Sequence, residues 1–421
     1  MKIGLFTDRY LPQTDGVSVA VEVLRAELEK LGHEVYVVAP KSSRTFTDTA
    51  PRIIRLPAIK GLWGMDEHFT TFFWPRRVLR RIDRLGLDVY HIHSPAQVGL
   101  LGVYCALHRG KPLINTYHTD YMAYTSHYAS RETLLGAMML TTLTTVTVEG
   151  RINDYSETAK SLRPRRSIIK WHRNMLANAL TQVHNRCDVV IAPSEKIRRQ
   201  LDKLHASSPT VTLASGINKI PTTRSAIRKW REKLDLQETD KVVLFVGRIS
   251  TEKNLGLLIK AFERVAKNIP EGKLVLAGPG ETDDVRAFQA QARATKCADR
   301  IIFTGEVKRS ELGALYGLAA VLGFPSLTDT QGLVINEAAA AGLPIVMVDR
   351  EITQVVIDGE NGYVAKASAR DFGDKLQRIL SDPKRRQAFS KRSCELAREC
   401  TAEKQVKKLV ALYGDIVQKE G

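Results

Sequence analysis

The chain has 421 residues, enough for two domains with full cores, and a formal net charge of +17. Such a charge indicates an anionic partner: a nucleotide, an anionic membrane surface or a nucleic acid. No helix-turn-helix, zinc-finger or aromatic RNA-binding motif accompanies it, which argues against a nucleic-acid-binding protein. The five cysteines show no paired spacing, so we expect reduced thiols and neither disulfides nor a zinc site. No apolar run reaches the roughly 18 residues of a membrane span, and no signal peptide is expected, which together favour a cytoplasmic protein.

The first half of the chain alternates short apolar strands with helices. Strands are predicted at residues 2–6, 34–38, 52–56, 89–93, 112–116 and 189–192. After the first strand, Asp15-Gly16 begins a helix whose apolar residues repeat at helical spacing, and Gly32 ends it. This alternation predicts a parallel, doubly wound α/β domain.

Residues 62–86, LWGMDEHFTTFFWPRRVLRRIDRLG, join an aromatic loop to a basic amphipathic helix that starts at Pro75. We expect the apolar face, Val78, Leu79, Ile82 and Leu85, to pack on the sheet. Each arginine of the other face would contribute about 1 kcal/mol near an anionic leaflet, and aromatic residues suit the membrane interface. The alternative is a solvated basic helix with partly buried aromatics. The predicted membrane-binding residues are Trp63, Phe72, Trp74, Arg76, Arg77, Arg80, Arg81 and Arg84.

A long connection, residues 131–175, precedes the last strand of this half. It predicts two helices, near 132–148 and 167–187. It also carries a second basic cluster, made of Arg163, Arg165, Arg166, Lys170 and Arg173 around Trp171. A lid, a membrane contact and a partner surface all remain open as its role.

The second half repeats the strand–helix alternation from about residue 241. Strands are predicted at 241–246, 273–277, 300–304, 321–324 and 344–348, and helices at 255–266, 312–318 and 332–342. A linker rich in Ser, Thr and Pro lies within 206–228. We therefore expect a second parallel α/β domain after this linker.

Two segments of the second half carry residues suited to a phosphorylated ligand. VGRISTEKNL (246–255) places Arg248 and Lys253 just after a strand. TDTQGLVINE (328–337) predicts a loop that opens a helix, where unpaired backbone N–H groups and the helix dipole attract phosphate. The carboxylates Asp329 and Glu337 would lie on either side of a bound phosphate and can accept hydrogen bonds from hydroxyl groups. The alternative is an ordinary helix capped by Thr328 or Asp329. The predicted phosphate-binding backbone is that of Thr330, Gln331, Gly332 and Leu333.

Together with the opening MKIGLFTDRYLPQTDGVSVAV, the HTD at His118 and the PSE at 193–195, these segments resemble the retaining nucleotide-sugar glycosyltransferases of family four. The resemblance extends from residue 1 to about 365. It implies the GT-B architecture: two Rossmann-like domains, 1–210 and 211–400, facing across a cleft. The last helix, within about 401–421, would pack back on the first domain. The first domain would serve the acceptor and the membrane, and the second would bind the nucleotide sugar.

The resemblance also implies roles for residues of the second domain. Arg248 and Lys253 would be the two cations that stabilise the leaving diphosphate, in place of a divalent metal. Glu337 would accept hydrogen bonds from the ribose hydroxyls. Asp329, one methylene shorter than the usual glutamate, would contact the sugar hydroxyls at carbon three or four. Val307 falls where the family builds its base pocket.

In the first domain, the resemblance assigns Gly16 and His118 to the donor. Gly16 would let the following backbone N–H groups approach the donor's distal phosphate. His118 would orient the sugar's primary hydroxyl and help to stabilise the oxocarbenium-like transition state. We interpret the neighbouring His91 and His93 as structural.

Within the family, NTYHTDY and TDTQGLV most resemble bacterial diacylglycerol glucosyltransferases and phosphatidylinositol mannosyltransferases. This implies retaining, metal-independent transfer of a hexose, from a donor such as UDP-glucose or GDP-mannose, to a membrane lipid such as diacylglycerol or phosphatidylinositol. Such a protein would be peripheral on the cytoplasmic leaflet and would need no cofactor. A soluble saccharide or small polyol is the alternative acceptor. A non-catalytic basic protein that binds nucleotides or nucleic acids is the alternative class.

Overall fold

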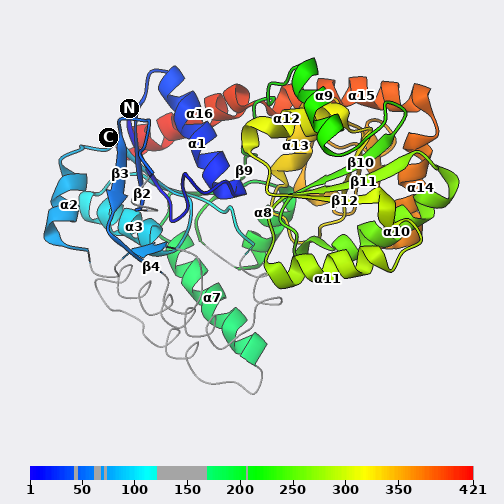
Figure 1. The fold of residues 1–421 in the computed structure, drawn as a ribbon. Helices are drawn as coiled ribbons and strands as arrows, with labels where there is room; N and C mark the ends of the chain where they lie inside the picture. Colours follow the sequence, from blue (N-terminus) through cyan, green and yellow to red (C-terminus); the bar gives the residue numbers. More distant parts are fainter. Residues whose placement is uncertain (42–45, 61–67, 71–73, 121–167, 205–206, 421) are drawn as a thin grey trace. The chain divides into compact units, whose positions relative to one another are not determined.

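The computed structural model describes residues 1–41, 46–60, 68–70, 74–120, 168–204 and 207–420. The chain forms two compact units (Figure 1). Unit 1 contains Met1–Gly216 together with Ala402–Gly421, and unit 2 contains Ile217–Thr401. The last helix of the chain therefore belongs to unit 1, as the GT-B expectation requires.

Unit 1 is built on a parallel seven-stranded sheet. Its strands are β1 (Lys2–Phe6), β2 (Glu34–Pro40), β3 (Ile53–Leu56), β6 (Val89–Ile92), β7 (Leu113–Thr116), β8 (Val189–Ala192) and β9 (Thr210–Thr212). Their order across the sheet is β3-β2-β1-β6-β7-β8-β9, and every pair is parallel. A separate antiparallel hairpin joins β4 (Ala58–Lys60) to β5 (His68–Thr70).

Helices cover both faces of this sheet, which explains why its central strands are apolar throughout. The helices of unit 1 are α1 (Gly16–Lys30), α2 (Arg76–Asp83), α3 (Gln97–Arg109), α7 (Ile168–His184), α8 (Glu195–Lys203) and α16 (Ala402–Glu420). The core on one face includes residues of α2, α3, α7 and α8. The core on the other face includes residues of α1 and α16, which lie side by side in Figure 1.

Unit 2 has a parallel six-stranded sheet with one continuous core. The strands are β10 (Lys241–Val246), β11 (Gly272–Ala277), β12 (Ile301–Gly305), β13 (Val321–Phe324), β14 (Ile345–Met347) and β15 (Gly362–Val364). Their order is β12-β11-β10-β13-β14-β15. The helices are α9 (Arg224–Lys233), α10 (Leu255–Asn268), α11 (Thr282–Arg293), α12 (Arg309–Leu318), α13 (Leu333–Ala340), α14 (Ala369–Leu380) and α15 (Pro383–Ala397). Four short 3₁₀ turns, η1 (Thr251–Lys253), η2 (Ala298–Arg300), η3 (Arg350–Ile352) and η4 (Arg398–Cys400), complete the unit. In Figure 1, α12 and α13 lie on one side of the sheet and α10 and α11 on the other.

Each sheet has one point at which the strand order reverses. In unit 1 the chain starts at β1 and adds strands first on the β2 side and then on the β6 side. In unit 2 the corresponding central pair is β10 and β13. Open α/β sheets bind their ligands at this point, beyond the carboxyl ends of the strands. The loops after β1, β6, β10 and β13 are therefore the places to look for functional residues.

The structure confirms the doubly wound α/β prediction for both halves, with small changes at the ends of elements. Pro75 is the N-cap of α2 and not its first helical residue. The predicted helix at 312–318 starts earlier, at Arg309. The helix predicted at 132–148 lies outside the described residues, whereas the one predicted at 167–187 is α7. The contact boundary between the units falls at residues 216 and 217, inside the predicted linker.

Two further expectations concern the cysteines and membrane spans. All five cysteines are free thiols, and four of them are buried. In the part of the chain that the structure describes, no helix has the length and apolar character to cross a bilayer.

Candidate functional site

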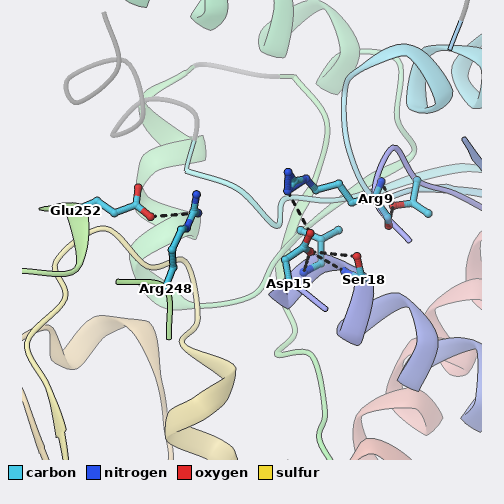
Figure 2. Close-up of polar contacts among 7 residues, drawn as sticks. Arg9, Asp15, Ser18, Arg248 and Glu252 are labelled. Carbon is cyan, nitrogen blue, oxygen red and sulfur yellow. Dashed lines mark hydrogen bonds and ion pairs between the residues drawn. The ribbon is translucent and has the colours of Figure 1, made fainter. Parts of the chain in front are cut away.

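The loop after β10 brings together Arg248, Glu252 and Lys253. Arg248 Nη2 lies 3.2 Å from Glu252 Oε1, an ion pair drawn in Figure 2. The Arg248 side chain is 52 % exposed, whereas the Glu252 carboxylate is buried. Lys253 ends the turn η1, and Asn254 follows it in the left-handed conformation before α10 begins. The short turn thus sets both cations at the carboxyl end of the central strand.

The loop after β13 supplies the acidic partner of Lys253. Lys253 Nζ donates to Asp329 Oδ1 at 2.8 Å, and both side chains are less than one-fifth exposed. Thr328 Oγ1 also donates to the carbonyl of Glu252 at 3.2 Å. Because β10 and β13 are neighbouring parallel strands, their loops meet at the same edge of the sheet. The structure therefore joins the two segments that the sequence analysis singled out.

Helix α13 begins without a side-chain cap. Its N-cap is Gly332, in the left-handed conformation with φ of 66°, and glycine has no side chain to cap the first turn. A Cβ at this position would lie 2.9 Å from Ile335 Cδ1, so glycine suits both the backbone and the packing. The N-cap is therefore Gly332 and neither Thr328 nor Asp329, the two residues predicted for that position. Gln331 is buried, and Thr330 and Leu333 are half-buried beside it.

Glu337 lies inside unit 2 with both carboxylate oxygens engaged. Arg309 Nη1 lies 2.6 Å from Oε1, and the Tyr316 hydroxyl donates to Oε2 at 2.9 Å. The Glu337 side chain is only 1 % exposed. Burial and the adjacent carboxylate raise the pKa of Tyr316 well above its usual value, so the phenol stays a donor. The predicted base-pocket residue Val307 is half-buried just before α12, the helix that carries both partners of Glu337.

In unit 1, Asp15 occupies the start of α1. One of its oxygens accepts from the backbone N–H groups of Val17 and Ser18, at 2.9 and 3.0 Å. The other accepts from Arg9 Nη1 at 3.2 Å, as Figure 2 shows. The following N–H groups that were expected to approach a phosphate are thus bonded to Asp15. This leaves the N–H of Gly16 itself as the group for the predicted contact.

His118 follows β7 and forms a hydrogen bond with a second histidine. Its Nε2 lies 3.0 Å from Nδ1 of His93, which follows the neighbouring strand β6. Burial lowers the pKa of His118 to about 4, although the charge of Asp15 acts in the opposite direction. His118 is therefore neutral at physiological pH.

The arginine face of α2 is exposed as predicted. Ile82 is fully buried, and Val78, Leu79 and Leu85 pack against the same core, so the apolar face is committed to unit 1. Arg76, Arg77, Arg80, Arg81 and Arg84 are all exposed. Trp74 is half-buried, with its ring centroid 5.6 Å from that of Tyr104. Trp63 and Phe72, like most of the basic connection 131–175, lie outside the described residues.

Four residues around these sites were missed by sequence analysis: Asp15, Glu252, Arg309 and Tyr316. Glu252 forms an ion pair with Arg248, and Arg309 and Tyr316 bind Glu337. Asp15 accepts hydrogen bonds from the backbone N–H groups that were expected to approach a phosphate after Gly16. Asp15 was recognised only as part of a helix start. Within the described ranges, no three His, Cys, Asp or Glu side chains gather as metal ligands would.

Two doubly wound units with polar residues at the switch point of each sheet fit the GT-B architecture expected of a glycosyltransferase. Comparison with protein families gives the same result for both halves of the chain. The family described as Glycosyltransferase Family 4 matches residues 14–219, and the family described as Glycosyl transferases group 1 matches residues 226–395. The chain belongs to glycosyltransferase family 4, and it is a glycosyltransferase.

Among its relatives is the alpha-monoglucosyldiacylglycerol synthase of Acholeplasma laidlawii, which is 30 % identical over 100 % of this chain and 98 % of its own length. The enzyme of the same name from Streptococcus pneumoniae is also 30 % identical, over 82 % of this chain and 70 % of its own length. Similar solved structures include sucrose-phosphate synthase from Thermosynechococcus elongatus, with a TM-score of 0.71, 20 % identity and 99 % of both chains covered. Anabaena Alr3699/HepE, in complex with UDP and glucose, has a TM-score of 0.68 and 16 % identity, with 98 % of both chains covered.

Proposed function

We propose that this protein transfers a hexose from a nucleotide-diphosphate sugar to a membrane lipid such as diacylglycerol or phosphatidylinositol. The donor would be of the UDP-glucose or GDP-mannose type, and the anomeric configuration would be retained without a metal ion. The observation that carries the proposal is the arrangement of Arg248 and Lys253 at the switch point of unit 2, each held by a carboxylate. Relatives named alpha-monoglucosyldiacylglycerol synthase and an Anabaena neighbour in complex with UDP and glucose support it.

In this proposal, Arg248 and Lys253 bind the diphosphate of the donor. The leaving nucleoside diphosphate gains negative charge as the glycosidic bond breaks, so fixed cations stabilise the transition state more than the ground state. The start of α13, whose N-cap is Gly332, would add the positive end of the helix dipole beside the predicted phosphate-binding backbone of Thr330, Gln331, Gly332 and Leu333. Because these groups already supply positive charge, turnover should persist in EDTA.

The two carboxylates would hold hydroxyl groups on either side of the diphosphate. Glu337 would accept hydrogen bonds from the ribose hydroxyls. Each carboxylate oxygen can accept two hydrogen bonds, so lone pairs remain beside those that Arg309 and Tyr316 occupy. Asp329 would bind the hydroxyls at carbon three or four of the sugar. Val307 would lie beside the base, and His118 and Gly16 of unit 1 would serve the sugar's primary hydroxyl and the distal phosphate.

Membership of this family and the neutral state of His118 support retention of configuration. His118 is neutral, but burial leaves its ring nitrogens weakly basic, so it is poorly suited to deprotonate an acceptor. We infer that the diphosphate departs from the same face that the acceptor attacks, and that a phosphate oxygen takes the acceptor's proton. Proton NMR of the first product tests this step. An α-linked donor should give an α-linked product, and a β-linked first product would exclude retention.

The lipid acceptor is proposed from the names of the relatives and from the exposed arginine face of α2. The direct test offers the enzyme two acceptors with each donor: diacylglycerol in vesicles that contain anionic lipid, and a panel of soluble saccharides and polyols. Transfer to the vesicle-borne lipid is expected. Transfer confined to the soluble panel would make a saccharide or polyol the acceptor instead.

The donor can be identified without an acceptor. A ligand at 100 times its dissociation constant stabilises the folded state by about 2.7 kcal/mol, which raises the melting temperature measurably. UDP-glucose and GDP-mannose should be compared with UDP and GDP alone, because the shared diphosphate is expected to account for part of each shift. A nucleotide sugar that shifts the wild type but not the Lys253→Ala variant is the donor to carry into the transfer assay. Absence of any shift would count against the whole proposal.

A further inference from the structure

Helix α12 carries both of the side chains that hold the Glu337 carboxylate. Arg309 is the first residue of this helix, and Tyr316 follows about two turns later on the same face. Arg309 Nη1 lies 2.6 Å from Oε1 of Glu337, and the Tyr316 hydroxyl donates to Oε2 at 2.9 Å. All three residues belong to unit 2. A single helix therefore fixes the direction in which the carboxylate points.

The three side chains differ in how much of their surface a ligand can reach. The Glu337 side chain is 1 % exposed and Tyr316 is 2 % exposed, whereas the Arg309 side chain is 32 % exposed. Arg309 thus supplies nearly all of the exposed surface of this cluster. A ligand that approaches the carboxylate from solvent therefore meets the Arg309 guanidinium as well.

A hydroxyl group can satisfy the arginine and the carboxylate together. A hydroxyl has one O–H donor and two acceptor lone pairs, whereas an ionised carboxylate only accepts and a guanidinium only donates. A hydroxyl beside this ion pair can therefore donate to Glu337 and accept from Arg309 at the same time. A phosphate oxygen cannot do so, because it has no proton to donate and would be repelled by the charge of Glu337. The pair thus favours a neutral hydroxyl over an anion.

The position of the pair indicates which hydroxyl of the nucleotide sugar it would meet. Val307, half-buried two residues before Arg309, is the predicted neighbour of the base. Glu337, in direct contact with Arg309, is the predicted partner of the ribose. Arg309 is therefore next to the predicted base contact in the sequence and next to the predicted ribose contact in space. A ribose hydroxyl is the group of the donor that both assignments place here.

We propose that Arg309 is a specificity-determining residue of the donor site, and that it donates a hydrogen bond to the ribose hydroxyl whose proton Glu337 accepts. The protein then selects ribonucleotides, because a donor without that hydroxyl leaves a guanidinium and a buried carboxylate without their ligand. This inference rests on the proposed function, since it takes Glu337 as the partner of the ribose. It adds a contact from a helix that the sequence motifs do not include.

Deoxynucleotides measure this contact directly. UDP and GDP would be compared with their 2′-deoxy and 3′-deoxy forms by isothermal titration calorimetry of the full-length protein. A hydrogen bond to a charged group corresponds to about 10- to 100-fold in affinity. The wild type should therefore bind at least one deoxy form weaker than the parent nucleotide by that factor. In Arg309→Met, which keeps an unbranched apolar stem but has no N–H group, this ratio should fall by about tenfold.

Two further variants make the result specific. Lys308→Met removes the same charge from an exposed position one residue earlier and should leave the ratio unchanged. Arg309→Lys keeps a charge opposite Glu337 but replaces the planar fork by a single nitrogen, so its ratio should lie between those of the wild type and Arg309→Met. Circular dichroism and thermal melts establish that each variant is folded at the temperature of the titration. Arg309→Lys carries the test if Arg309→Met does not fold.

The kinetic arm distinguishes a ribose contact from a contact with the leaving group. The ribose is bound alike before and during cleavage of the glycosidic bond, so loss of this contact removes uniform binding. We expect Arg309→Met to raise the KM for the nucleotide sugar about 10-fold or more and to change kcat little. The Arg248→Ala and Lys253→Ala variants should instead lower kcat.

The outcomes separate this inference from the proposed function. If the wild type binds UDP or GDP and their deoxy forms equally, or if the ratio is unchanged in Arg309→Met, the inference is overturned while the donor site stands. A wild-type ratio in Arg309→Lys, or a fall in the kcat of Arg309→Met without a rise in KM, would overturn it as well. If the wild type binds neither UDP nor GDP, the proposed function fails and this inference fails with it.

Discussion

Arg248, Lys253 and Arg309 each form an ion pair with a carboxylate in unit 2. Two of the carboxylates, Glu252 and Glu337, are buried, so their cations compensate charges that would otherwise be costly. The pairs also hold each cation in place before a ligand arrives, which lowers the reorganisation needed when negative charge develops on a leaving group.

The first prediction concerns the two cations after β10. Arg248→Ala and Lys253→Ala should each lower kcat by about 10²- to 10³-fold, because each removes a fixed donor to the developing charge. Steady-state kinetics with saturating donor and acceptor measure the effect. Lys260→Ala removes the same charge from the exposed side of α10 and serves as the control. Normal turnover in both site variants would contradict the assignment.

The second prediction concerns Arg309, which sequence analysis did not identify. The buried Glu337 carboxylate is bound by Arg309 and Tyr316, and Arg309→Met removes the first of these two partners. Breaking a fully buried pair costs about 3–5 kcal/mol, and since Arg309 is itself 32 % exposed we expect about 2–3 kcal/mol. Urea unfolding measures this loss. Arg264→Met breaks an exposed pair with Asp374 and should cost at most about 1 kcal/mol. Equal effects in the two variants would show that Arg309 has no special role.

The residues of the site differ in whether the sequence around them predicts their position. Arg248, Lys253 and Asp329 were predictable, because each follows a strand and parallel strands end at one edge of a sheet. Arg309 and Tyr316 reach Glu337 from another helix, and no spacing within the sequence reports that contact. Asp15 illustrates a different difficulty. Its position as an N-cap was predictable, but the consequence, that its carboxylate occupies N–H groups expected to meet a phosphate, depends on geometry.

At the scale of elements, helix α2 combines a committed face with an available one. Its apolar residues pack into the core of unit 1, which fixes the orientation of the helix. The arginines of the opposite face therefore stay exposed. Five exposed arginines on a helix of eight residues and its C-cap form a dense basic surface. This density suits a sheet of anionic headgroups better than a single small ligand.

The third prediction follows from this surface. The protein should co-sediment with vesicles that contain anionic lipid and not with purely zwitterionic vesicles, and binding should weaken with salt because the Debye length falls to about 8 Å at physiological ionic strength. Replacing the five arginines, Arg76, Arg77, Arg80, Arg81 and Arg84, by Gln should abolish binding. Hydrolysis of the donor without acceptor should not change.

A control of equal charge distinguishes this surface from the net charge of the protein. Changing Lys384, Lys391, Lys404, Lys407 and Lys408 to Gln removes the same five charges from exposed positions of α15 and α16. This control variant should still bind anionic vesicles. If it loses binding to the same extent, the contact is diffuse and α2 is not its site.

Among the strands, those of four or more residues were predicted, and most of the three-residue strands were missed. Most of the predicted strands agree with the structure to within one or two residues, because buried parallel strands form continuous apolar runs between turn residues. The three-residue strands β9 and β15 and the hairpin of β4 and β5 were missed, since runs this short show no periodicity. The start of α12 was missed for a related reason: its first turn, Arg309 to Glu311, is polar and does not share the apolar pattern.

At the scale of the whole molecule, the histidines are distributed unevenly. All ten precede residue 217, so unit 2 has none. Within unit 1, burial lowers the pKa of His91 to about 3 and that of His118 and His184 to about 4. A histidine that is neutral when folded takes up a proton on unfolding below its ordinary pKa of about 6.5, so acid favours the unfolded state.

The fourth prediction is that mild acid destabilises unit 1 selectively. The contribution of each buried histidine is fully present above about pH 6.5 and is lost as the pH falls toward 4, by up to about 1.4 kcal/mol per pH unit. Hydrogen exchange at pH 7.5 and pH 5.0, corrected for intrinsic rates, should show a loss of protection in β6 and β7 and little change in β10 and β11. A uniform loss over both sheets would contradict the prediction. His184→Gln should reduce the difference, since it removes one of the titrating groups.

Helix α16 has a consequence for how the chain is made. Val406, Leu409, Tyr413 and Ile416 of this helix are buried in the core of unit 1, yet they are synthesised after every residue of unit 2. Domains usually fold in the order in which they leave the ribosome. Here that order is reversed, because unit 2 is complete once residue 401 has emerged, whereas unit 1 must wait with an open apolar face until residues 402–420 follow. During translation the first half of the polypeptide is therefore the last to mature, and it is the half for which a chaperone has most to do.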